Sequence, residues 1–183
     1  MILEKPLSKM VLDFFLDLLK SFAIAIIIFY ALNFFFVFTI VEGKSMQPTF
    51  KEHERLVVNK TTSFFNNYER GDIIVFYPPI RTTNEKLFIK RVIAVPNDHL
   101  QIENGNVYID GELLYEEYTN NQSTDTNEPI DIIIPEGYVF VLGDNRGNSI
   151  DSRFKDIGLI PVENIIGKVF IRFYPLDRFK IWR

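Results

Sequence analysis

The hydrophobic pattern of the chain changes near residue 41. Residues 21–41 carry no charged side chain, and Asn33 is the one strongly polar residue among them. A helix needs roughly 20 apolar residues to cross the hydrocarbon core of a bilayer. The pattern therefore predicts a single transmembrane helix over residues 21–41, with a short segment, residues 1–20, before it.

Two other interpretations of residues 21–41 are a buried core helix and a cleaved signal peptide. The hydrophobic region of a signal peptide is usually about 7–15 residues long and ends at a site of small residues. Here the aromatic run Phe34-Phe35-Phe36-Val37-Phe38 occupies that place. An uncleaved anchor is the favoured interpretation. Basic residues are too evenly distributed on its two sides to set its orientation.

From Arg55 onward, short runs of β-branched and aromatic residues alternate with turn residues, which is typical of strands. We therefore expect residues 42–183 to form one mostly β domain with an acidic lobe inserted at about 98–135. Asn104-Gly105 predicts a type I′ hairpin turn within that lobe. The predicted strands cover residues 55–59, 72–77, 87–95, 100–103, 107–109, 132–134, 138–142 and 166–174.

Composition and charge exclude several kinds of chemistry. The chain has no cysteine, which excludes disulfides, thiolate metal sites and a cysteine nucleophile. Its two histidines, His53 and His99, lie in polar sequence without a metal-binding spacing, so no metal or cofactor is predicted. No Lys or Arg occurs between Arg91 and Arg146, where acidic residues are frequent. Nucleic acid is therefore not expected as a partner.

A serine or threonine activated by a lysine is the catalytic chemistry that this composition leaves. Three positions after residue 41 the chain reads Lys44-Ser45-Met46. Lys44 is a poor base for Ser45, because adjacent residues of an extended segment point to opposite faces. Lys90 lies in the apolar run 87–95, where burial would lower the pKa of its amine from about 10.4. Taken alone, Lys90 is also compatible with a surface charge at a strand edge.

Four segments resemble, in order, the sequence boxes of the type I signal peptidases. These membrane-bound serine endopeptidases remove signal peptides from exported preproteins. Each box alone is weak, but the ordered set behind an N-terminal apolar segment is specific and spans nearly all of the chain. The resemblance implies the mostly β signal-peptidase fold, in the short form found in Gram-positive bacteria. The boxes are SMQPT at 45–49, GDIIVF at 71–76, KRVIAVP at 90–96 and GDNRGNSIDSR at 143–153.

The resemblance also implies roles for individual residues. Ser45 matches the nucleophile and Lys90 the general base of a Ser/Lys dyad that needs no cofactor. Ser149 matches the serine whose hydroxyl orients the lysine amine. Asp151 and Arg153 match a supporting ion pair. For Ser149, Asp151 and Arg153, turn formation is the alternative role.

Two positions depart from the family pattern. Gly43 stands where some bacterial relatives have a serine that stabilises the oxyanion. The resemblance implies that the backbone N–H of Ser45 is one oxyanion donor, and that Gly43 allows close backbone approach or supplies a second N–H. Asn97 replaces a usual glycine, and we expect the turn to survive because asparagine tolerates positive φ.

The implied function is cleavage of signal peptides after small residues at positions −1 and −3. The implied partners are exported preproteins and membrane lipid, and the protein is expected to be a monomer. The implied location is the plasma membrane, crossed once, with residues 1–20 cytoplasmic and residues 42–183 extracytoplasmic. One alternative is a relative without hydrolytic activity that assists surface-fibre assembly, but such relatives lose the nucleophile or the base. Another is a self-cleaving repressor-type Ser-Lys protease, which has a DNA-binding domain where this chain has its apolar segment.

Overall fold

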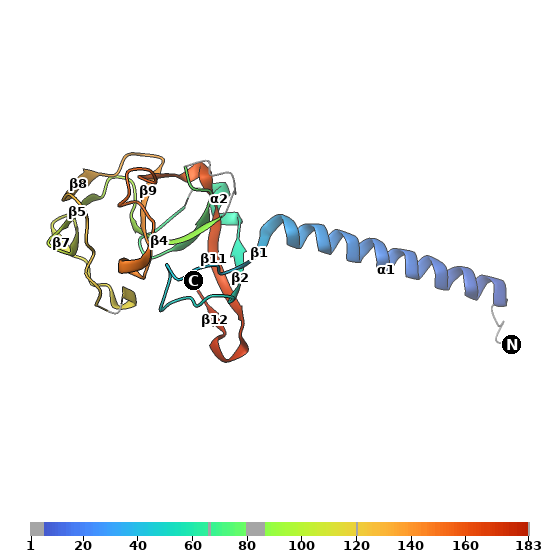
Figure 1. The fold of residues 1–183 in the computed structure, drawn as a ribbon. Helices are drawn as coiled ribbons and strands as arrows, with labels where there is room; N and C mark the ends of the chain where they lie inside the picture. Colours follow the sequence, from blue (N-terminus) through green and yellow to red (C-terminus); the bar gives the residue numbers. More distant parts are fainter. Residues whose placement is uncertain (1–5, 66, 80–86, 120, 183) are drawn as a thin grey trace. The chain divides into compact units, whose positions relative to one another are not determined.

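The computed structural model describes residues 6–65, 67–79, 87–119 and 121–182, so residues 1–5 of the predicted N-terminal segment lie outside it. The chain divides into two compact units, Met1–Phe36 and Val37–Arg183. Figure 1 shows the elements of both units. They are α1 (Leu7–Phe35), β1 (Phe36–Ile40), β2 (Arg55–Asn59), α2 (Thr61–Phe65), β3 (Ile73–Phe76), β4 (Phe88–Ala94), β5 (His99–Glu103), β6 (Asn106–Ile109), β7 (Glu112–Leu113), η1 (Glu117–Thr119), β8 (Ile130–Ile133), β9 (Tyr138–Leu142), η2 (Arg146–Asn148), β10 (Ile160–Pro161), η3 (Val162–Asn164), β11 (Ile165–Tyr174), η4 (Leu176–Arg178) and β12 (Lys180–Ile181).

The first unit consists of helix α1, whose bounds differ from the predicted helix over residues 21–41. The helix begins directly after Pro6 and ends where Phe36 adopts an extended backbone. Residues 36–40 then form β1, which pairs with β2. The prediction was wrong at this end because an apolar run gives the same signal in a helix and in a buried or edge strand.

The predicted membrane-spanning character of this helix is likewise not confirmed. Across the part of the chain that the structure describes, no helix combines the length and the apolar character that crossing a membrane requires.

The second unit contains two sheets, and the strand pairs formed among β2 to β12 are antiparallel. In the described residues the larger sheet has eight strands in the order β1-β2-β11-β3-β4-β9-β10, and β12 pairs with β11 (Figure 1). All eight predicted strands are present, with ends within two residues of the predicted ones. The prediction of a mostly β domain is confirmed. The strands that the sequence pattern did not reveal are β1 and the two-residue strands β7, β10 and β12.

The smaller sheet has the strand order β7-β6-β5-β8 and lies between His99 and Ile133. These residues fall inside the segment 98–135 that was predicted to form an acidic lobe. The β5–β6 hairpin turns at Asn104 and Gly105, whose φ angles of 51° and 79° are both positive, as a type I′ turn requires. Asn97 also has a positive φ, 72°, so the turn does survive the replacement of glycine.

Buried side chains form clusters on both faces of the larger sheet, and one of them includes the segment after β1. In this cluster Met46 and Phe50 pack against Leu56, Val75 and Val169. Met46 is 2% exposed and Phe50 is fully buried. Burial of such side chains stabilises a fold by about 1.5–3 kcal/mol each. Residues on both sides of positions 47–49 are therefore fixed to the sheet.

Candidate active site

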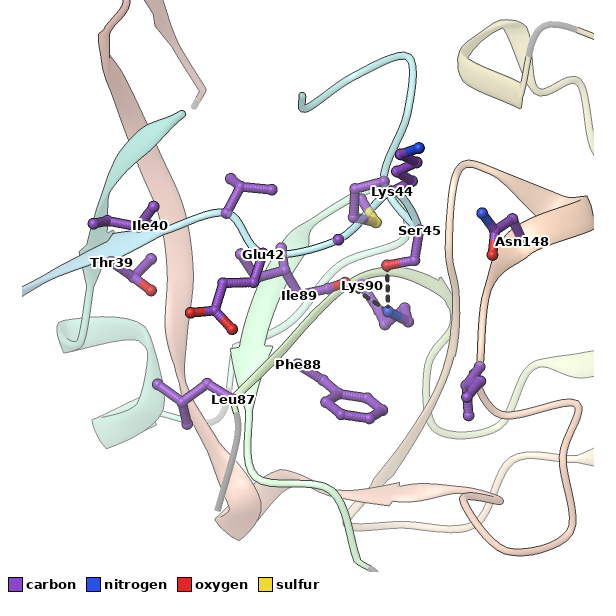
Figure 2. A pocket seen from close by; sticks show the side chains of 14 residues that line it. Thr39, Ile40, Glu42, Lys44, Ser45, Leu87, Phe88, Ile89, Lys90 and Asn148 are labelled. Carbon is purple, nitrogen blue, oxygen red and sulfur yellow. Dashed lines mark hydrogen bonds between the residues drawn. The ribbon is translucent and has the colours of Figure 1, made fainter. Parts of the chain in front are cut away.

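Ser45 and Lys90 meet although they lie on separate elements. Ser45 is in the loop between β1 and β2, and Lys90 is in the middle of β4. The Lys90 Nζ donates a hydrogen bond of 2.8 Å to Ser45 Oγ and another of 3.1 Å to the carbonyl oxygen of Ile89 (Figure 2). The structure therefore brings the two residues of the predicted dyad into direct contact.

The surroundings of Lys90 favour its neutral form. Lys90 is 4% exposed, and its Nζ lies 5.1 Å from the centre of the Phe88 ring, which alternation along the strand places on the same face. Burial lowers the pKa of Lys90 to about 8, although the carboxylates of Asp151 and Asp144 act in the opposite direction. Lys44, by contrast, is exposed, and Figure 2 shows its side chain directed away from Lys90.

The loop of residues 143–153 binds the backbone of the segment that carries Ser45. The Asn145 N–H donates to the carbonyl oxygen of Ser45 at 3.0 Å, and Asn145 Nδ2 donates to the carbonyl oxygen of Lys44 at 3.0 Å. These bonds hold both peptide groups around Ser45. Asn145 is therefore a positioning residue, which the sequence boxes alone did not reveal.

The same loop contains the three predicted supporting residues, Ser149, Asp151 and Arg153. Asp151 is fully buried and accepts hydrogen bonds from Gly143 N at 3.0 Å and Arg153 Nε at 2.9 Å, so the predicted ion pair with Arg153 is present. Ser149 Oγ is also buried, but it has no hydrogen-bond partner in the described part of the protein. A bond from Ser149 to the amine of Lys90 therefore stays a prediction.

Gly43 has a φ of 82°, a backbone conformation that favours glycine. Its N–H donates to Glu52 Oε1 at 3.3 Å. The Gly43 N–H, which was considered as a second oxyanion donor, is thus already bonded to the carboxylate of Glu52. The role of Gly43 in catalysis stays a prediction.

A buried ion pair beside Lys90 was missed in the sequence. Arg91 Nε and Nη2 donate to the two carboxylate oxygens of Asp144 at 2.8 and 2.7 Å. Arg91 is 8% exposed and Asp144 fully buried. Thr49 Oγ1 donates to the same carboxylate. The sequence signal was an arginine inside an apolar strand, since a buried guanidinium requires an acidic partner.

A groove of about 570 Å³ lies over the dyad and is lined by residues 39–46 and 87–90, together with Asn148 and Ile150. Among the described residues, β4 pairs with β9 only from Arg91 onward, and β1 is the first strand of the sheet. Each side of the groove therefore includes a strand edge, β1 on one side and, on the other, the part of β4 before Arg91 that does not pair with β9. In the same residues, no cluster of three or more His, Cys, Asp or Glu side chains could hold a metal ion.

Comparison with known proteins identifies the family of this chain. A family model described as signal peptidase, peptidase S26, matches residues 15–174. Signal peptidase I P of Bacillus subtilis subsp. natto is 35% identical over 174 residues, which cover 90% of this chain and 92% of that protein. Probable signal peptidase I-1 of Synechocystis sp. is 43% identical over 143 residues, covering 75% of this chain and 71% of that protein. A crystal structure of a signal peptidase I from Enterococcus faecalis V583 has 31% identity and a TM-score of 0.46, covering 56% of this chain and 96% of that one. The chain belongs to the type I signal peptidases of peptidase family S26, which are serine endopeptidases.

Proposed function

We propose that this protein cleaves signal peptides from exported preproteins with a Ser45/Lys90 dyad. The observation that carries the proposal is the 2.8 Å contact between Ser45 Oγ and a buried Lys90 Nζ. Burial supplies what a lysine base needs, because it lowers the pKa of Lys90 to about 8 and so raises the fraction of neutral amine.

The reaction would proceed by acyl transfer to Ser45. The neutral Lys90 amine takes the hydroxyl proton while Ser45 Oγ attacks the scissile carbonyl, and it then gives a proton to the leaving amine. In the second half, the same amine removes a proton from water as the water attacks the acyl carbonyl, and it then returns that proton to Ser45 Oγ as the ester bond breaks. The backbone N–H of Ser45 is the proposed oxyanion donor. Such a donor contributes about 3–4 kcal/mol to transition-state stabilisation.

The strand edges on the two sides of the groove support a preference for small residues. An extended substrate segment that pairs with these edges would form backbone hydrogen bonds by strand addition. Alternate residues of an extended segment point to the same face, so the side chains at −1 and −3 would both face the enzyme. The groove there is lined by Phe88 and Ile89, whose side chains would contact those of the substrate. We propose that these contacts restrict positions −1 and −3 to small residues.

We further propose that the protein works in contact with membrane lipid, with its catalytic domain on the side to which preproteins are exported. Helix α1 has no buried residue, and apolar side chains such as Ile27 and Phe29 are 67% and 62% exposed. A continuous exposed apolar surface along a helix is covered by lipid or by another molecule. Co-sedimentation with phospholipid vesicles measures this contact.

The dyad can be tested with a purified preprotein that carries Ala-x-Ala before the cleavage site. Ser45→Ala and Lys90→Ala should each lower kcat by about 10³-fold or more, because members of a nucleophile–base pair act as a unit. Lys44→Ala is the matched control, since it removes a neighbouring lysine whose side chain is exposed. It should retain most of the activity. Equal activity in the three variants would contradict the dyad.

A further inference from the structure

Two arginines from the end of the chain bind the backbone of the loop that carries Ser45. We name residues 43–53 the nucleophile loop. Arg172, in β11, donates from Nη1 to the carbonyl oxygen of Thr49 at 2.8 Å. Arg178, in η4, donates from Nη2 to the carbonyl oxygens of Pro48 and Thr49 at 3.3 and 3.4 Å. Two consecutive peptide groups, close to Ser45 in the chain, are thus held by guanidinium groups.

A buried carboxylate fixes both guanidinium groups. Glu54 is 3% exposed and accepts from Arg172 Nη1 at 3.0 Å and from Arg178 Nη1. Arg172 Nε also donates to the carbonyl oxygen of Arg178 at 2.6 Å. An unpaired charge in this position would be costly, and the planar guanidinium has few orientations that satisfy all its partners. The group of Arg172, Arg178 and Glu54 is therefore a rigid contact to the nucleophile loop.

Two aromatic rings, one from the nucleophile loop and one from the C-terminal segment, pack beside the Arg172 guanidinium. β12 pairs with β11 (Figure 1). The residue after β12 is Trp182, whose backbone N–H donates to the carbonyl oxygen of Phe170 at 2.9 Å. The Trp182 ring lies 5.1 Å from the ring of Phe50, and the Arg172 guanidinium is 5.8 Å from Phe50 and 5.5 Å from Trp182. Phe50 belongs to the nucleophile loop and its N–H donates to the carbonyl oxygen of Met46 at 2.8 Å.

The opposite side of Thr49 is bound to the strand that carries the base. Thr49 Oγ1 donates to Asp144, and Asp144 is paired with Arg91, the residue after Lys90. Thr49 is therefore held at its carbonyl by Arg172 and at its hydroxyl by Asp144. One residue of the nucleophile loop connects the C-terminal segment to the surroundings of the base.

We infer that Arg172, Arg178 and Glu54 form a positioning clamp that holds the nucleophile loop so that Ser45 Oγ stays within hydrogen-bond distance of Lys90 Nζ. This inference rests on the proposed function, because it concerns the same dyad. None of the three residues touches the reacting atoms. Their effect reaches the reaction through Thr49 and the backbone of the loop.

A positioning role differs measurably from a general contribution to folding. The clamp residues do not line the groove or bury Lys90. Their loss should therefore lower kcat, whereas KM and the pH profile of activity should stay the same. General loosening of the domain would admit water to Lys90. That would raise its pKa and move the activity profile to higher pH.

The test uses the full chain with Arg178→Met, which replaces the aliphatic part of the side chain but removes the guanidinium and its bonds to Pro48, Thr49 and Glu54. Arg178 is partly exposed, so Arg178→Met should disturb folding less than a substitution of the buried Arg172 by Met. Arg172→Lys provides a second test variant, because it keeps the charge but loses the planar guanidinium. Lys180→Met is the matched control: it removes a positive charge from the same segment, and its exposed ammonium lies over the Trp182 ring at 5.1 Å. We expect Arg178→Met to lower kcat about 10- to 100-fold, with KM within about twofold of wild type.

Equal kcat values for Arg178→Met and Lys180→Met would overturn the clamp, as would a loss of kcat accompanied by a shift of the pH profile. A second measurement does not depend on catalysis. Amide hydrogen exchange in residues 44–50 should become faster in Arg178→Met and stay unchanged in Lys180→Met. If the wild type cleaves no preprotein, the proposed function fails, and the exchange measurement alone then decides whether the clamp exists.

Discussion

At the scale of single residues, the amine of Lys90 is under opposing influences. Its surroundings remove water and so disfavour the ammonium, whereas Asp151 and Asp144 favour it. Arg153 and Arg91 pair with these two carboxylates and reduce their pull on the amine. The ion pairs of the 143–153 loop therefore have an electrostatic effect on the base besides fixing the loop.

The pH dependence of cleavage follows from this balance. With the pKa of Lys90 lowered to about 8, roughly one molecule in ten carries the neutral amine at pH 7. Because the neutral form is the base, kcat/KM should rise about tenfold per pH unit below pH 8 and level off above it. Initial rates with an Ala-x-Ala peptide between pH 5 and 10 measure this profile.

The histidines provide the control for that profile. His53→Asn combined with His99→Gln removes both imidazoles, and asparagine suits the φ of 68° at position 53. The profile of this double variant should match the wild type. A rise that occurs in the wild type and disappears in the double variant would assign the dependence to histidine instead.

At the scale of elements, periodicity predicted the strands, and the ordered boxes predicted which residues meet at the site. Ser45 and Lys90 could be paired because each lies in a box of its own. The end of α1 at Phe35 could not be predicted, since the apolar run continues into β1 and only pairing with β2 marks the change. Contacts such as Arg172 with Glu54 were hidden for a similar reason: the partners are far apart in sequence and no local pattern links them.

The close approach of β11 to β2 depends on Gly167. A Cβ added there would lie 2.1 Å from the carbonyl oxygen of Asn59 and 2.8 Å from its carbon, both backbone atoms that cannot move aside alone. Gly167→Ala should therefore lower the free energy of unfolding by about 1–3 kcal/mol. Urea unfolding followed by the fluorescence of Trp182, the single tryptophan, measures the change.

Gly147→Ala is the matched control for this substitution. No heavy atom lies within 4 Å of a Cβ added at Gly147, so the free energy of unfolding should change by less than about 0.5 kcal/mol. Similar losses in the two variants would mean that contact with Asn59 does not determine the cost at position 167.

At the scale of the whole molecule, the hydrophobic core and the exposed apolar helix belong to different units. The buried residues of the three hydrophobic clusters all lie between Val41 and Val169, in the second unit. The groove and the dyad belong to that unit as well. Helix α1 contributes no buried residue and exposes its apolar side chains. Removing the helix should therefore separate two properties of the protein that are otherwise measured together.

A chain that begins at Phe36 keeps β1 and lacks α1. Its free energy of unfolding should lie within about 0.5 kcal/mol of the full chain in the same detergent, because no core contact is lost. Its kcat/KM for a soluble Ala-x-Ala peptide should be unchanged within about twofold. Co-sedimentation with phospholipid vesicles should fall to background, since the exposed apolar side chains of α1 are gone. Retained vesicle binding would place the lipid contact in the catalytic unit, and a truncated chain that fails to unfold cooperatively would show that the helix contributes to its stability.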